Sequence, residues 1–202
     1  MPPTCDFVMS NLAVLEQHTM GLSIGEYLGH GAWGAVFRSS DLRWIIKVTK
    51  DFNEQKAIEF VLDKRGKGYE ATLFPGLAEV LSVAKVPDLD DDGETLYVIV
   101  RENVLPVKDF PIDKKLLHDL DHALYVIEER QAYSIEDAAA ALSTRDDGAP
   151  YIGRSLRELL YYGYRLVDLD PQNMGLTIRP RLGAPEGSLV MFDISFEEKD
   201  DG

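Results

Sequence analysis

The first half of the chain contains short, mostly apolar segments that are bounded by turn residues, a pattern that indicates β-strands. Glycine-rich or acidic turns separate these segments. After the third strand, Asp51-Phe-Asn-Glu54 resembles a helix N-cap with an acid at the third helical position, and Ile58, Val61 and Leu62 follow at helical spacing. The pattern therefore predicts an antiparallel sheet with one helix after its third strand. The predicted strands are residues 24–28, 35–39, 44–49, 78–86 and 95–104.

The second half is predominantly helical. A first helix is predicted over 113–130, a short second one from Ser134, and a third carries Leu156, Leu159 and Leu160. Extended segments are predicted at the end of this half: 164–167, 174–178 and 188–192.

Three parts follow from this change of pattern. Residues 1–21 form an N-terminal extension, 22–104 a strand-rich lobe, and 105–202 a helical lobe. Within the extension, Val8, Leu12 and Leu15 recur at helical spacing, so we expect it to pack on the small lobe or on another subunit. The predicted fold class is α+β with two lobes.

Composition excludes several classes of protein. Among 202 residues, 35 acidic and 21 basic side chains give a formal charge of −14, which disfavours nonspecific binding to nucleic acid or anionic membrane. The one cysteine, Cys5, can form no intramolecular disulfide, and the start resembles no secretory signal. No apolar run is long enough to span a membrane. We expect a cytoplasmic protein.

Two features of the first half suit a phosphate ligand. Gly29, Gly31 and Gly34 lie between two predicted strands, where the lack of a β-carbon lets backbone amides approach phosphate oxygens. Lys47 lies in the next strand between Ile46 and Val48, where a lysine without a function would be costly to bury. Read alone, the glycines could be an ordinary hairpin turn, and Lys47 an edge residue.

The second half carries the groups that would complete such a site. A carboxylate beside an acceptor hydroxyl can orient it, while an amide oxygen and a second carboxylate can bind Mg²⁺. Asp168, Asn173 and Asp193 supply these groups. Each could alternatively be a turn residue that hydrogen-bonds the local backbone.

Two other constellations carry less weight. His118 and His122 have the spacing of a zinc pair, but they fall opposite the apolar stripe of their predicted helix and no third ligand follows. Residues 88–93 begin like a calcium loop, but Ile99 occupies the position of the bidentate acid. A solvated helix face and an acidic hairpin turn explain them.

Taken together and in this order, the motifs resemble the protein-kinase-like fold, including its compact bacterial and phage-type members and small-molecule phosphotransferases. Gly29-His-Gly31-Ala-Trp-Gly34-Ala-Val36 resembles the G-x-G-x-x-G-x-V loop, and Ile46-Lys47 the strand-lysine motif. Other segments resemble the entry to the fourth strand, the adenine-binding hinge, the catalytic loop and the metal motif. They are 74–80, 101–104, 166–173 and 193–195.

The resemblance implies ATP and Mg²⁺ as cofactors and phosphoryl transfer as the reaction, with the acceptor open. Asp168 would orient the acceptor and Lys47 the phosphates, while Asn173 and Asp193 would bind Mg²⁺. The residues implied to contact ATP are Gly29, Gly31, Gly34, Val36, Lys47, Glu102 and Val104.

The carboxylate partner of Lys47 is implied to lie on the following helix. Glu54 lies on the apolar stripe but only seven residues beyond Lys47, and Glu59 has the distance more typical of the family. We expect Glu59 and keep Glu54 as the alternative.

The chain also departs from the family pattern. Leu166 and Val167 replace the usual His and Arg, and Asp170 replaces the lysine that contacts the γ-phosphate, for which Arg154, Arg165, Arg179 or Arg181 could compensate. Only nine residues follow Asp193, so the resemblance implies no peptide-docking lobe. The alternative function is therefore a pseudokinase-like protein that binds or inhibits a protein partner.

Overall fold

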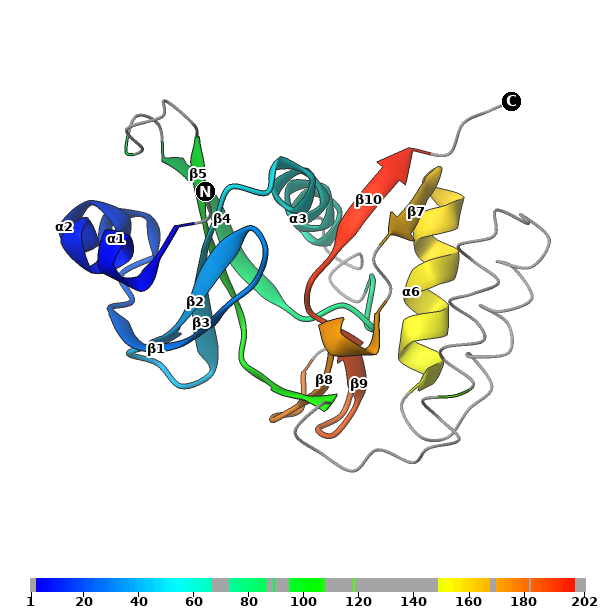
Figure 1. Cartoon of the computed structure of the whole chain (residues 1–202). Helices are drawn as coiled ribbons and strands as arrows, with labels where there is room; N and C mark the ends of the chain where they lie inside the picture. The colour runs from blue at the N-terminus through cyan, green and yellow to red at the C-terminus, as the bar shows by residue number, and fades with distance from the viewer. Residues whose placement is uncertain are drawn as a thin grey trace. The chain divides into compact units, whose positions relative to one another are not determined.

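The computed structural model describes residues 3–66, 73–86, 89, 95–107, 118, 149–167, 170–181 and 183–198. The protein is α+β and divides into two compact units (Figure 1). Unit 1 is Met1–Leu62 with Glu79–Asn103, and unit 2 is Asp63–Ala78 with Val104–Gly202. The N-terminal extension thus belongs to unit 1, and residues 63–78, expected in the first lobe, belong to unit 2. No described helix is both long and apolar enough to cross a membrane.

Unit 1 contains the predicted five-stranded antiparallel sheet, in the order β1-β2-β3-β5-β4. The helix after β3 connects to the edge strand β4, and β5 returns beside β3, so the lysine strand is central. The bounds are β1 (Ile24–His30), β2 (Gly34–Ser39), β3 (Trp44–Thr49), β4 (Val80–Val86) and β5 (Leu96–Glu102).

One face of this sheet packs on the N-terminal helices, α1 (Cys5–Ser10) and α2 (Leu12–Leu15), which the turn η1 (Glu16–His18) follows. Val8 and Leu15 are fully buried there. The N-terminal extension therefore packs on the sheet of unit 1. The shared core is Val8, Leu15, Ile24, Ala35, Phe37, Trp44, Ile46, Val48, Val86, Leu96, Val98 and Val100.

Helix α3 (Phe52–Arg65) lies on the other face (Figure 1). Because side chains alternate along a strand, Lys47 points away from the face that carries Ile46 and Val48. The Asp51 carboxylate accepts hydrogen bonds from the amides of Asn53 (2.9 Å) and Glu54 (3.1 Å). The predicted N-cap is therefore confirmed.

Among its described residues, unit 2 combines a helix with two small antiparallel sheets. Helix α6 (Ala149–Tyr161) contacts β7 (Tyr164–Val167) and β9 (Leu189–Met191). One sheet has the order β6-β8-β9, and the other pairs β7 with β10. The remaining bounds are β6 (Val104–Pro106), β8 (Met174–Thr177), β10 (Ser195–Glu198) and the turn η4 (Pro171–Asn173).

The structure departs from the predicted elements around the boundary of the two units and within unit 2. The strand predicted over 95–104 ends at Glu102, and Val104 begins β6 in a different sheet. Strand β10 was not predicted. The helix over 113–130, apart from His118, and the short helix from Ser134 lie outside the described residues.

Residues 76–78 join unit 2 through backbone contacts. The Met191 amide donates to the Gly76 carbonyl (2.8 Å), and the Ala78 amide donates to the Met191 carbonyl (2.7 Å). A β-carbon on Gly76 would lie 2.4 Å from the Ile152 Cα in α6. Only glycine therefore allows the helix backbone this close.

Candidate functional site

The glycine turn between β1 and β2, residues 29–34, has a defined backbone with an exposed tip. The Gly31 amide donates to the Gly34 carbonyl (2.9 Å) and closes the turn. The Trp33 carbonyl accepts from the Lys50 amide (3.0 Å), so the end of β3 supports the turn. The Trp33 side chain is 63% exposed.

Two of the glycines differ in what surrounds them. A β-carbon on Gly34 would lie 2.5 Å from the Val48 carbonyl oxygen and 2.9 Å from the Thr49 Cβ. A β-carbon on Gly31 would meet nothing within 4 Å. Gly34 is therefore required by packing, whereas Gly31 leaves open space above the backbone, as an approaching ligand needs.

Lys47 forms a buried ion pair with Glu54. Its Nζ lies 2.9 Å from Glu54 Oε1 and 2.8 Å from Glu54 Oε2. The lysine is 6% exposed and the glutamate is fully buried. Strand β3 places the ammonium and the first turn of α3 places the carboxylate, so two consecutive elements build the pair.

The expectation that Glu59 is the partner of Lys47 is wrong. Glu59 is exposed, and Glu54 lies on the buried side of α3 with Ala57, Ile58 and Val61. Helical periodicity explains this, because Glu54 lies one turn before Ile58 and therefore on the same buried face of α3, whereas Glu59 falls outside that face. Burial, and secondarily the charge of Glu59, instead raises the pKa of Tyr97.

The segment that resembles an adenine-binding hinge contains side chains with structural contacts. Glu102 is fully buried, and its Oε2 accepts from the Glu79 amide (3.0 Å). Val104 pairs with Thr177 of β8, and its side chain packs on Gly175. Val36 pairs with Lys47 across β2 and β3.

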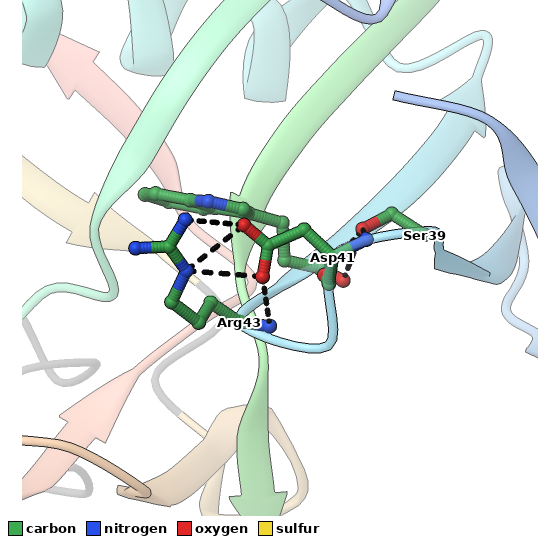
Figure 2. Close-up of polar contacts among 4 residues, drawn as sticks. Ser39, Asp41 and Arg43 are labelled. Carbon is green, nitrogen blue, oxygen red and sulfur yellow. Dashed lines mark hydrogen bonds and ion pairs between the residues drawn. The ribbon is translucent and has the colours of Figure 1, made fainter. Parts of the chain in front are cut away.

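The β2–β3 turn lies beside this segment, since the Asn103 amide donates to the Arg43 carbonyl (2.8 Å). Figure 2 shows Arg43 against the Asp41 carboxylate, which its Nε approaches to 2.9–3.0 Å. This hydrogen bond, with the charge of Asp41, raises the pKa of Arg43. The pair is exposed, and its role is to shape the turn.

In unit 2 the β8–β9 hairpin brings two of the predicted metal ligands to one end. Asn173 directly precedes β8, Asp193 follows β9, and Met174 pairs with Met191. The Phe192 amide donates to the Asn173 carbonyl (2.8 Å). Amide and carboxylate oxygens are ligands that Mg²⁺ prefers. Among the described residues no three His, Cys, Asp or Glu side chains form a metal cluster.

The position that the resemblance assigns to a phosphate-binding lysine is a helix cap here. Asp170 Oδ1 accepts from the Gln172 amide (2.8 Å), and Oδ2 from Gln172 Nε2 (3.1 Å). Two of the arginines considered as compensation also have structural contacts. Arg154 pairs with Glu158 (2.8 Å), and Arg181 donates to the carbonyls of Leu77 (2.8 Å) and Pro75.

Asp168 lies outside the described residues, as does the side chain of Arg165. The structure adds one residue that the sequence reading missed. Thr49, at the end of β3, is fully buried, and its hydroxyl contacts both the glycine turn and the start of α3. In the sequence, Thr49 could have been recognised as a polar residue at the end of a buried strand, two residues before the Asp51 cap.

In comparisons with known proteins, this chain matches no family model and no curated protein sequence.

Proposed function

We propose that this protein is a minimal kinase-like phosphotransferase, with a bilobal kinase-like fold, that binds ATP with Mg²⁺ and transfers a phosphoryl group. The observation that carries this proposal is the buried Lys47–Glu54 pair beside the glycine turn. Turn, lysine and carboxylate all belong to unit 1 and are consecutive along the chain.

A buried ion pair does not by itself indicate a gain in stability, because well-packed apolar residues can often replace it without loss of stability. A lysine held by a buried glutamate, in the strand that supports a glycine turn, has a clear chemical use. Its ammonium neutralises phosphate oxygens while the glutamate orients it. The backbone amides of residues 29–34 would contact the same phosphates, and Gly31 leaves them open to approach.

Asn173 and Asp193 fit a magnesium ion by the chemistry of their oxygen donors and by their place at one end of the β8–β9 hairpin. When bound, Mg²⁺ would supply charge neutralisation at the phosphate oxygens. Asp168 would orient the acceptor hydroxyl and accept its proton.

Binding and transfer are tested separately. We expect MgATP to raise the melting temperature, since a ligand that binds only the folded state stabilises it. With γ-labelled ATP, wild type should label itself or an added acceptor, and Asp168→Ala should lose transfer while it still binds ATP. Asp193→Asn should lose Mg²⁺-dependent labelling. Unchanged turnover in Asp168→Ala would refute the assigned role.

A second candidate is a pseudokinase-like protein that binds or inhibits a protein partner. The observation in its favour is Asp170, whose carboxylate caps η4 where the resemblance expects a cation. The formal charge of −14 suits a basic partner surface, with association that weakens as salt rises. A melting shift with MgATP but no transfer would favour a nucleotide-binding pseudoenzyme, and no shift would favour a partner-binding role alone.

A further inference from the structure

The Thr49 hydroxyl joins two parts of unit 1. Its Oγ1 donates to the Trp33 carbonyl in the glycine turn (3.2 Å) and accepts from the Asp51 amide (3.1 Å). The residue is fully buried. One hydroxyl therefore satisfies a turn carbonyl and an amide at the start of α3 in the same place.

From Asp51 the contacts continue to the ion pair. The Asp51 carboxylate caps the amide of Glu54 (3.1 Å), and the Glu54 side chain binds Lys47. Packing reinforces the connection at its other end, because a β-carbon on Gly34 would lie 2.9 Å from the Thr49 Cβ. The turn is thus linked to the ion pair through the side chains of Thr49, Asp51 and Glu54 in succession.

We propose that Thr49 is a positioning residue that couples the glycine turn to the Lys47–Glu54 pair. The inference rests on the proposed nucleotide site, in which turn amides and the lysine ammonium must meet the same phosphates. Because the Thr49 hydroxyl contacts the Trp33 carbonyl of the turn and the Asp51 amide before α3, a displacement of the turn changes the start of α3 and, through Asp51 and Glu54, the position of the lysine. Nucleotide binding at the turn and the geometry of the ion pair are then coupled.

Ser39 offers a matched control at the opposite end of the same strand pair (Figure 2). Its hydroxyl lies 3.0 Å from the Trp44 carbonyl and accepts from the Asp41 amide (3.2 Å). It is 3% exposed. Like Thr49, Ser39 contacts one backbone carbonyl and one backbone amide through a single buried hydroxyl, but its contacts lie in the β2–β3 turn and at the start of β3 rather than at the glycine turn and α3.

The test compares three variants of the full chain. Thr49→Val keeps the shape and removes the hydroxyl, Thr49→Ser keeps the hydroxyl, and Ser39→Ala removes the matched one. By calorimetry we expect Thr49→Val to lower the affinity for MgATP about fivefold to tenfold, which corresponds to the loss of about one hydrogen bond. Thr49→Ser and Ser39→Ala should stay within about twofold of wild type, since each leaves the bonds of the Thr49 hydroxyl intact.

A double-mutant cycle with Glu54→Gln separates coupling from general destabilisation. If Thr49 acts through the ion pair, adding Thr49→Val to the Glu54→Gln variant should lower the affinity for MgATP by less than about twofold. An additive effect, or equal losses in Thr49→Val and Ser39→Ala, would overturn the proposal.

Amide hydrogen exchange, measured without nucleotide, tests the inference independently of binding. It applies if Glu54→Gln binds MgATP too weakly to measure, and it also applies if wild type binds no MgATP and the proposed function is wrong. In Thr49→Val we expect faster exchange at Lys50, which donates to the turn, and also at Glu54. Ser39→Ala should leave Glu54 unchanged. Acceleration confined to Lys50 would show that the hydroxyl acts on the turn alone and would refute the coupling.

Discussion

The two units position their candidate groups by different means. In unit 1 Lys47 and Glu54 are both buried, and their contact depends on charge complementarity inside the core. In unit 2 Asn173 and Asp193 are partly exposed, and backbone pairing of β8 with β9 brings them to one end of a hairpin.

This difference tells which changes each unit tolerates. Loss of one buried charge removes the ion-pair partner of the other, which is among the most destabilising single changes. A hairpin end tolerates polar substitution but depends on close packing behind it, which in unit 2 includes Gly76 against α6. The predictions below follow this contrast.

The largest expected effect is in unit 1. Glu54→Ala leaves the Lys47 ammonium buried without this partner and should lower the free energy of unfolding by about 3–5 kcal/mol. Both tryptophans, Trp33 and Trp44, belong to unit 1, so urea unfolding followed by fluorescence reports on it. Glu59→Ala is the control and should change stability by less than about 0.5 kcal/mol. Similar losses in both variants would contradict the observed pairing.

In unit 2 the most sensitive position is expected to be Gly76. Gly76→Ala puts a methyl group 2.4 Å from the Ile152 Cα, so α6 and the loop that carries Gly76 must move apart. We expect this to lower the free energy of unfolding by about 1–3 kcal/mol. Circular dichroism during thermal unfolding measures the loss. Gly31→Ala, whose β-carbon meets nothing within 4 Å, should unfold like wild type. If both alanine variants melt together, the close approach of α6 is not required.

Two capping aspartates, one in each unit, provide a smaller matched comparison. Asp51→Ala removes the cap of α3 and should cost about 1 kcal/mol, and it should also weaken MgATP binding through Glu54. Asp170→Ala removes the cap of the three-residue η4 and should cost about 0.5 kcal/mol. Urea denaturation and calorimetry with MgATP measure both. A larger loss of affinity in Asp170→Ala would reverse the contrast between the units.

The smallest effect is expected at high pH. Burial, with the Glu59 charge second, raises the pKa of Tyr97, so the folded state keeps this proton after the unfolded state has lost it. Stability should therefore fall as pH rises above about 10, the ordinary tyrosine pKa. Tyr97→Phe should flatten this alkaline loss in urea denaturation series at several pH values. An unchanged alkaline slope in Tyr97→Phe would assign the loss to other groups.

Local pattern was sufficient for much of unit 1. Short apolar segments bounded by turn residues predicted all five strands of the sheet within a few residues of their ends. The Asp51 cap was predictable because capping depends on residues within one turn. The same local reasoning missed β10 and placed Val104 in β5, since strand partners distant in sequence decide which sheet a short segment joins.

The order of glycine turn, strand lysine and helix cap was legible from the chain, because turns, strand alternation and caps are properties of neighbouring residues. The sequence did not show which carboxylate pairs with Lys47. That choice depends on the rotation of α3 about its axis relative to the sheet, which packing of Ala57, Ile58 and Val61 sets. For the same reason the adjacency of Asn173 and Asp193 exists only in the tertiary structure, where strand register brings distant residues to one hairpin end.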